Sequence, residues 1–304
     1  MNASSGDYEL LDFGDGRKLE RFGGVILDRP SPAAEGAAKA RPDAWRVATA
    51  RYDRTHGEQG EWTPKKAALQ RWNVSFALEP QTGLDPTERR HGTIISLQLQ
   101  GSPFGHVGVF PEQQDNWRWI ARQVATRKAI GQRPVRVLNL FAYTGASTLA
   151  ASAGGADVVH IDAARNIVER ARRNAELSQL SDRPIRWIAE DATKFCQREL
   201  KRGNRYDAVI LDPPTYGHGP KGESWKFAEH VLPLLRMCAE LTSESRAFVL
   251  MTTHTPGIGQ AELAAYVAQG FFGSCSQPPE TGELLLANSD GRRLPSGVFA
   301  RWPA

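Results

Sequence analysis

Three aspartates in the second half of the chain each follow a short apolar run, and a tight turn follows an earlier run. The turn is the segment 139–145, Asn-Leu-Phe-Ala-Tyr-Thr-Gly, and the aspartates are Asp162, Asp191 and Asp212. A carboxylate that closes one strand can accept hydrogen bonds from both hydroxyls of a ribose, and one after the next strand can accept a bond from an adenine amino group. The turn holds one glycine, which gives a pyrophosphate little backbone to approach. These residues favour an adenosine ligand without phosphate.

Each aspartate also has an ordinary interpretation. Asp162 is about as well explained as a strand-end residue, and Asp191 as the N-cap of the next helix. The sequence Asp212-Pro213-Pro214 is compatible with a simple strand-ending turn. All three aspartates occupy equivalent places after successive strands, and this common register favours the ligand interpretation.

The elements that must position these residues alternate between strand and helix. Apolar runs flanked by amphipathic segments predict an α/β fold with a doubly wound, mostly parallel sheet covered on both faces. The expected strands are 135–140, 157–161, 185–189, 208–211 and 247–251, and the expected helices are 146–153, 164–177, 192–202, 227–241 and 260–269. Two final strands, 283–287 and 298–302, have no helix between them. We expect a seven-stranded Rossmann-like sheet that ends in an antiparallel excursion.

The first part of the chain has a different pattern. Glycine and proline interrupt it every few residues, and the strand candidates are 8–13, 24–27, 73–78 and 93–99. Asp15 and Gly16 predict a hairpin turn, and the periodicity predicts a helix over 116–130. We therefore expect a smaller β-rich N-terminal domain on the substrate side, residues 1–115, and a second domain, residues 116–304.

Composition limits the class of protein. Of the 304 residues 40% are hydrophobic and 24% are charged, and no stretch has the ~20 consecutive apolar residues of a membrane span. The first residues lack the pattern of a secretory signal, and Cys196, Cys238 and Cys275 have neither disulfide nor zinc-site spacing. We expect a cytoplasmic protein without a metal site or a membrane partner. The sequence does not predict its oligomeric state.

Positive charge is concentrated in the second half. Residues 121–304 hold 23 lysines and arginines against 18 acidic residues, within a total net charge of +4. A run without acidic residues contains Arg122, Arg127, Lys128, Arg133 and Arg136. A solvated surface is the commoner explanation of such a run. If the partner is RNA, we expect Arg122, Arg127, Lys128, Lys221 and Lys226 on one face with Asp212, in contact with phosphates.

The turn, the three aspartates and the terminal strand pair together resemble the class I S-adenosylmethionine-dependent methyltransferases over about residues 130–304. More narrowly, the segments 138–145 and 210–216, Leu-Asn-Leu-Phe-Ala-Tyr-Thr-Gly and Ile-Leu-Asp-Pro-Pro-Thr-Tyr, resemble the large-subunit ribosomal RNA methyltransferases. Members of that family methylate cytosine C5 or guanine N7. The segment 106–113, His-Val-Gly-Val-Phe-Pro-Glu-Gln, is similar to a family segment that packs beside the cofactor.

The resemblance implies S-adenosylmethionine as the cofactor and a role for each matching residue. Asp162 would bind the ribose hydroxyls and Asp191 the adenine edge. Asp212 with Pro213 would form the face where the methyl acceptor meets the sulfonium, with proline carbonyls turned toward the acceptor because proline has no N–H. The residues implied to hold the methionine part are Asn139, Phe141, Tyr143, Thr144 and Gly145, and those implied to lie beside the cofactor are Phe110 and Gln113.

The nucleophile of cytosine methylation is missing from its place. Cytosine C5 is a poor nucleophile, so the enzymes that methylate it first add a cysteine thiolate to C6. In cytosine-modifying members of the family this cysteine follows the fifth strand, where this chain reads Met251-Thr-Thr-His254-Thr. The three cysteines lie elsewhere, and Cys196 and Cys238 have the pattern of core residues. A purine nitrogen or another heteroatom is therefore the better acceptor.

Two residues near Asp212 are candidates for binding the acceptor. Asp212-Pro-Pro-Thr-Tyr216 is similar to the motif of enzymes that methylate exocyclic amines, in which an aromatic ring stacks on the base, although Tyr216 comes one residue later. A packed core tyrosine is equally compatible. His254 is a candidate general base or orienting group, and a structural histidine is the commoner case. The segment 216–227, with Lys221, Trp225 and Lys226, predicts a mobile lid with phosphate-binding charge and a stacking ring.

The leading hypothesis is a methyltransferase that acts on a base of RNA, ribosomal by the family resemblance, after the base is turned out of its stack. Methylation of a small molecule or a protein is the second hypothesis, and a non-catalytic RNA-binding relic of the fold is the third. An NAD-dependent oxidoreductase is disfavoured because the glycine fingerprint is absent.

Overall fold

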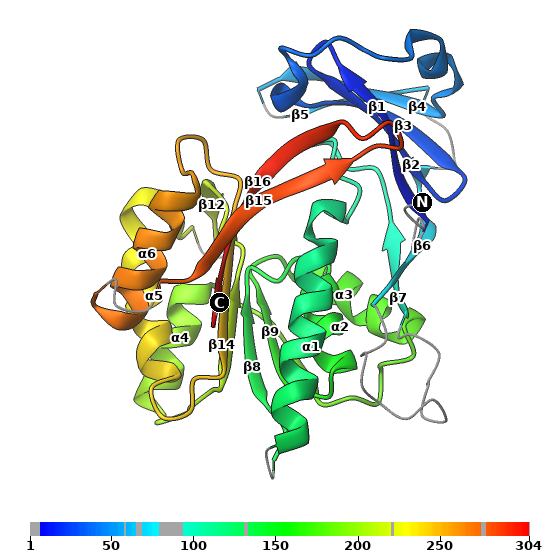
Figure 1. Ribbon diagram of the computed structural model, residues 1–304. Helices are drawn as coiled ribbons and strands as arrows, with labels where there is room; N and C mark the ends of the chain where they lie inside the picture. Colours follow the sequence, from blue (N-terminus) through cyan, green and yellow to red (C-terminus); the bar gives the residue numbers. More distant parts are fainter. Residues whose placement is uncertain are drawn as a thin grey trace. The chain divides into compact units, whose positions relative to one another are not determined.

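Two compact units make up the chain (Figure 1). The computed structural model describes residues 7–57, 59–64, 69–78, 94–130, 133–219, 222–274 and 278–303. The first unit comprises Met1–Gln114 and Leu285–Ser296, and the second comprises Asp115–Leu284 and Gly297–Ala304. The division is therefore not sequential, because a segment near the C-terminus clusters with the N-terminal unit.

The second unit is built around a seven-stranded sheet with the order β10-β9-β8-β11-β14-β16-β15. The first five strands of this order are parallel, and β16 runs antiparallel to β14. The strands are β8 (Arg136–Leu140), β9 (Asp157–Asp162), β10 (Ile185–Ala189), β11 (Ala208–Leu211), β14 (Phe248–Thr253), β15 (Glu280–Ala287) and β16 (Arg293–Trp302). The predicted doubly wound, mostly parallel seven-stranded sheet is confirmed.

Helices cover both faces of this sheet (Figure 1). On one face lie α1 (Gln114–Ile130), α2 (Ala146–Ala153) and α3 (Arg165–Leu177), and on the other α4 (Ala192–Lys201), α5 (Phe227–Leu241) and α6 (Gln260–Phe272). Phe195, Leu234 and Leu263 from the second set meet Leu138 and Val209 of the sheet in one core cluster. Every residue of β11 and β14 is buried, because the strands are covered on both sides.

The first unit contains a five-stranded sheet, order β1-β2-β3-β4-β5, and a separate antiparallel pair, β6 and β7. Its strands are β1 (Tyr8–Gly14), β2 (Arg17–Phe22), β3 (Val25–Pro30), β4 (Ala50–His56), β5 (Gln59–Thr63), β6 (Trp72–Ala77) and β7 (Ile94–Leu99). The predicted hairpin turn joins β1 to β2, with Asp15 and Gly16 at φ 52° and 70°, the left-handed region that short hairpin turns need. The sequence did not predict β4 and β5, which are largely exposed and lack an apolar run.

A buried carboxylate anchors the middle of the β15–β16 hairpin inside the first unit. Asp12 is fully buried and accepts hydrogen bonds from Trp45 Nε1 at 2.8 Å, from the Arg41 amide at 3.0 Å and from the Arg292 guanidinium. Burial opposes ionisation of Asp12, but these donors outweigh it and lower its pKa to about 2.

Across the described ranges, none of the helices has the length and apolarity that crossing a membrane requires.

Candidate functional site

The carboxyl ends of four neighbouring parallel strands bring the predicted site residues to one edge of the sheet. Leu140 is in register with Ile161 and with Leu211, and Ala189 is in register with Asp162. The turn after β8, Asp162 at the end of β9, Asp191 after β10 and Asp212 after β11 therefore emerge at the same edge. The strand order reverses around β8 and β11, which is where open α/β sheets bind their ligands.

The turn after β8 is held in an unusual backbone conformation. Phe141, Tyr143 and Gly145 have φ of 55°, 48° and 93°. Left-handed φ costs a residue other than glycine about 1 kcal/mol or more, and such strain clusters at ligand sites. A Cβ on Gly145 would also lie only 3.1 Å from the Cβ of Ala171 on α3, so this position suits glycine on both counts.

Asp162 ties this turn to the second strand. Its Oδ2 accepts the Tyr143 amide at 2.9 Å, and its Oδ1 accepts the Ala164 amide at 3.0 Å. Burial raises the pKa of the Asp162 carboxyl, against the opposing effect of the two amide bonds. Each oxygen keeps a second lone pair after these bonds. The carboxylate can therefore hold the turn and accept two ligand hydroxyls at once.

Asp191 is the N-cap of α4. Its Oδ1 accepts the Lys194 amide at 2.9 Å, in the β-region conformation typical of a cap. The side chain is half-buried at the same edge as Asp162. The capping interpretation is thus confirmed, and binding of an adenine edge stays a prediction.

A buried polar network supports the turn from inside the unit. Asn139 is 2% exposed, and its Nδ2 donates to Thr148 Oγ1 at 2.8 Å. Thr148 Oγ1 lies 2.9 Å from Nδ1 of the fully buried His160. Burial lowers the pKa of His160 to about 3, so this imidazole is neutral in the folded protein at physiological pH. Residue pattern carries no signal for Thr148 or His160, because both look like ordinary core positions.

Thr144 is held in the same way. Thr144 is 2% exposed as a whole residue, and its carbonyl accepts Asn174 Nδ2 at 2.9 Å. Asn174 is itself fully buried on α3. Thr144 is therefore held in place by α3, and cofactor binding by the turn residues stays a prediction.

The Asp212 motif forms the other part of this edge. Thr252 at the end of β14 donates its hydroxyl to Asp212 Oδ1 at 2.7 Å. Pro213 is buried, whereas Tyr216 is 73% exposed. The interpretation of Tyr216 as a packed core residue is therefore wrong, and its ring is accessible for stacking.

Trp225 does not have the predicted environment. The segment after Asp212 forms a short hairpin, in which β12 (Tyr216–His218) pairs with β13 (Ser224–Lys226). Trp225 is 7% exposed, so it is not an open stacking ring, and that expectation is wrong. Its Nε1 donates to the Pro214 carbonyl at 2.7 Å, which also corrects the expectation that this carbonyl faces the acceptor. Lys221 lies outside the described residues.

His254 follows β14 and is exposed. A Cβ on Gly297, whose φ is 123°, would lie 2.8 Å from His254 Nδ1, so the glycine leaves room for the imidazole.

Cys196 and Cys238 are both fully buried, as expected of core residues, and Cys275 lies outside the described residues. Phe110 and Gln113 belong to the first unit, where Phe110 is the N-cap and Gln113 the last residue of the 3-10 helix Pro111–Gln113, and their contact with a cofactor stays a prediction.

Arg127 and Lys128 do not lie beside Asp212, which corrects the expectation for these two residues. Arg127 Nη2 donates at 3.3 Å to the carbonyl of Ala247, just before β14 begins, and the Lys128 side chain lies against Gly155, just before β9. Both residues belong to the last turn of α1, where cations suit the helix dipole. That turn lies at the amino edge of the sheet. Lys226 does lie beside Tyr216, and its Nζ is 2.9 Å from Glu229 Oε1.

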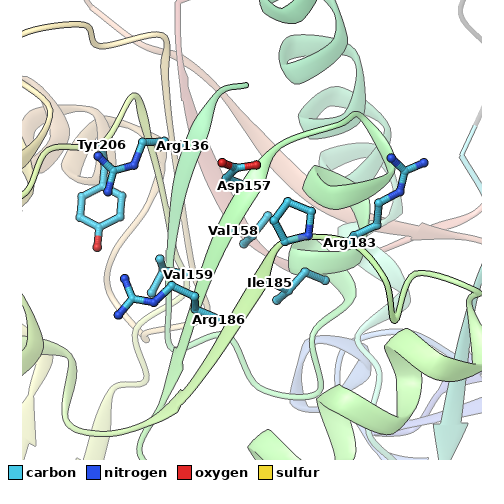
Figure 2. Close-up of a pocket in the computed structure, with 9 residues that line it drawn as sticks. Arg136, Asp157, Val158, Val159, Arg183, Ile185, Arg186 and Tyr206 are labelled. Carbon is cyan, nitrogen blue, oxygen red and sulfur yellow. The ribbon is translucent and has the colours of Figure 1, made fainter. Parts of the chain in front are cut away.

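A pocket of about 340 Å³ opens at this amino edge (Figure 2). Arg136 stacks on Tyr206 with 5.3 Å between its guanidinium carbon and the ring centroid, and Arg183 points away from both. Asp157, at the start of β9, also lines the pocket. The pocket is therefore at the opposite end of the strands from Asp162 and Asp212, and it is not the predicted site.

Comparison with known proteins identifies the family. A model of S-adenosylmethionine-dependent methyltransferases matches residues 90–272. Curated ribosomal RNA large subunit methyltransferase I of Aeromonas hydrophila is 35% identical over 227 residues, which cover 70% of this chain and 52% of the relative. The protein of the same name from Salmonella arizonae is 30% identical over 212 residues, 66% of this chain and 47% of the relative. The chain thus spans about half the length of these relatives.

A solved structure matches nearly the whole chain. The crystal structure of the SAM-dependent methyltransferase from Agrobacterium tumefaciens has a TM-score of 0.85 and is 33% identical. The match covers 99% of this chain and 91% of that one. The likeness therefore includes both units and not only the sheet that carries the aspartates.

Proposed function

The chain belongs to the S-adenosylmethionine-dependent methyltransferase family, and from this premise we propose that it methylates a base of ribosomal RNA. The observation that carries the substrate is the similarity to curated large-subunit ribosomal RNA methyltransferases. The exposed ring of Tyr216, four residues after Asp212, supports a base as acceptor because every base offers a face for stacking. The proposed setting is ribosomal RNA processing in the cytoplasm.

The residues at the carboxyl edge fit S-adenosylmethionine. The second lone pairs of the two Asp162 oxygens suit the ribose hydroxyls, and the half-buried Asp191 carboxylate suits the adenine amino group. We propose that the backbone of the turn binds the methionine part. The hydrogen bond from Asn139 to Thr148 supports the start of this turn from the interior of the unit. Phe141, Tyr143, Thr144 and Gly145 are the proposed contacts.

We propose that the residues of this chain act by aligning the two reactants. S-adenosylmethionine supplies a methyl group that its positive sulfur already activates. The protein has to hold the acceptor in line with that group and exclude water. Thr252 fixes the Asp212 carboxylate, and the carbonyls of Asp212 and Pro213 are the groups proposed to face the acceptor. His254, exposed after β14, is proposed to orient the acceptor or take its proton.

A nitrogen is the proposed acceptor atom. Methylation of cytosine C5 needs a thiolate that adds to C6. The two cysteines within the described residues, Cys196 and Cys238, are fully buried between α4 and α5 and cannot reach a base. Ring and exocyclic nitrogens of purines need no covalent adduct, so they fit the side chains at this edge.

Mass mapping of ribosomal RNA nucleosides from cells with and without the gene tests the substrate. We expect one methylated base to disappear in the deletion strain and to return when the purified protein and S-adenosylmethionine are added to that RNA. If the protein binds S-adenosylhomocysteine but no methylated base is lost, the RNA substrate is wrong and a small molecule or protein takes its place. If it binds no S-adenosylhomocysteine, the cofactor assignment is wrong.

A further inference from the structure

Trp225 contacts both loops that the proposed reaction requires. Its ring packs on Phe141 of the turn after β8, with 4.9 Å between the ring centroids and 59° between the planes. Its indole N–H donates to the Pro214 carbonyl in the loop after β11, at 2.7 Å. One side chain thus bridges the loop assigned to the methyl donor and the loop assigned to the acceptor.

The contact with Phe141 bears on the shape of the turn. Phe141 has a φ of 55°, a conformation that a phenylalanine holds only when its surroundings require it. The Trp225 ring fixes the Phe141 side chain. The amide of the next residue, Ala142, donates to the Ile161 carbonyl at 3.0 Å. Loss of the indole ring would let the turn relax toward ordinary backbone angles.

The contact with Pro214 bears on the acceptor face. Proline has no N–H, so a Pro-Pro pair has only its carbonyls with which to be anchored by hydrogen bonds. The Phe227 amide also donates to the Thr215 carbonyl at 3.0 Å, which closes the base of the hairpin. Lys194 on α4 forms an ion pair with Glu223 in the same hairpin. Trp225 is therefore carried on a hairpin that is itself docked at both ends.

We propose that Trp225 is a positioning residue that fixes the methyl donor and the methyl acceptor in a common geometry. The proposal rests on the proposed function, since it assigns the two loops to donor and acceptor. Its indole N–H fixes the position of the Pro213-Pro214 segment. Its ring fixes the conformation of the turn that receives the methionine part. The two contacts belong to different parts of the indole, so they can be removed separately.

Two substitutions separate the contacts. Trp225→Phe keeps an aromatic ring against Phe141 and removes the N–H, so we expect kcat on ribosomal RNA from the deletion strain to fall about tenfold or more. The affinity for S-adenosylhomocysteine should stay within about twofold. Trp225→Leu removes both contacts, and we expect it to weaken S-adenosylhomocysteine binding as well. Trp119→Phe is the matched control, because Trp119 is equally buried and packs on Phe248, the first residue of β14, at the amino edge of the sheet.

Amide exchange provides a readout that does not depend on activity. In Trp225→Phe the Phe227 amide should exchange faster while the Tyr143 amide stays protected, and in Trp225→Leu both should exchange faster. A lower Tm with unchanged kcat, or an equal loss of kcat in Trp119→Phe, would reduce Trp225 to an ordinary core residue and overturn the proposal. If the wild-type protein transfers no methyl group to RNA, the proposed function fails. The exchange pattern and S-adenosylhomocysteine affinities then still decide whether Trp225 links the two loops.

Discussion

The amide of Tyr143 donates to Asp162 Oδ2 at 2.9 Å, so the turn after β8 is pinned to the last residue of β9. Asp162 therefore stabilises the conformation of the neighbouring backbone before any ligand binds. Tyr143 has a φ of 48°, and the bond to Asp162 is one of the contacts that hold this conformation. A carboxylate assigned to a ribose thus also shapes the turn assigned to the methionine part.

Replacement of Asp162 should weaken cofactor binding. We expect Asp162→Ala to cost about 1–3 kcal/mol of S-adenosylhomocysteine affinity, because a charged acceptor for two hydroxyls and for the Tyr143 amide is lost. Calorimetry on variants that remain folded by circular dichroism measures the loss. Asp157→Ala, at the other end of the same strand, is the control and should bind normally. Unchanged affinity in Asp162→Ala would remove the ribose assignment, and tighter binding of NAD than of S-adenosylhomocysteine would remove the cofactor class.

Methyl transfer should not need a cysteine. We expect a variant with all three cysteines replaced by alanine to keep its activity in the folded fraction, with the cost confined to stability because Cys196 and Cys238 are core residues. Urea unfolding and single-turnover transfer measure the two quantities separately. Trapping of a covalent complex with RNA that contains 5-fluorocytosine, lost on Cys275→Ala, is the result that would restore cytosine C5 chemistry.

Tyr216 should act on the acceptor and not on the cofactor. We expect Tyr216→Ala to lower RNA turnover by the equivalent of about 1–3 kcal/mol, the usual contribution of one aromatic ring stacked on a base. S-adenosylhomocysteine affinity should not change. Tyr216→Phe keeps the ring and should retain most of the activity. Equal losses in the alanine and phenylalanine variants would assign the effect to the hydroxyl and exclude stacking.

Lys226 and Arg127, which lie at opposite edges of the sheet, should contribute differently to RNA binding. Lys226 lies beside Tyr216, so we expect Lys226→Ala to lower RNA affinity and to reduce the slope of log affinity against log salt by roughly one. Arg127→Ala, at the amino edge of the sheet, should leave that slope unchanged. Filter binding at several salt concentrations measures both. A slope reduced equally by Arg127→Ala would mean that RNA also contacts the amino edge.

Stability should fall in mild acid because of His160. Burial lowers the pKa of His160 to about 3 in the folded protein, while an unfolded histidine titrates near 6.5. Between these values the unfolded chain binds more protons than the folded one, so the free energy of unfolding decreases as the pH falls. The contribution is up to about 1.4 kcal/mol per pH unit. Urea unfolding at pH 7, 6 and 5 should show this slope in the wild type and a smaller one in His160→Gln. Equal slopes would exclude His160 as the source.

Sequence periodicity was enough to predict the sheet. The residues of β8, β11 and β14 form apolar runs because helices cover them on both sides, and such runs are visible without coordinates. The hairpin β12–β13 was not predicted, since it has three residues in each strand and a glycine-rich connection that is typical of a loop. The strands β4 and β5 were not predicted because they are largely exposed and carry charged residues.

The sequence by itself determined the fold class and the edge at which the aspartates meet, because parallel strands in a doubly wound sheet must place the residues after them at one edge. Only the tertiary structure decided what each side chain faces there. Trp225 looked like an open ring and is a buried bridge, whereas Tyr216 could have been core and is exposed. Arg127 and Lys128 are near the site residues in the chain but lie at the opposite edge. Burial and direction depend on contacts between segments distant in sequence, and local residue pattern does not encode those contacts.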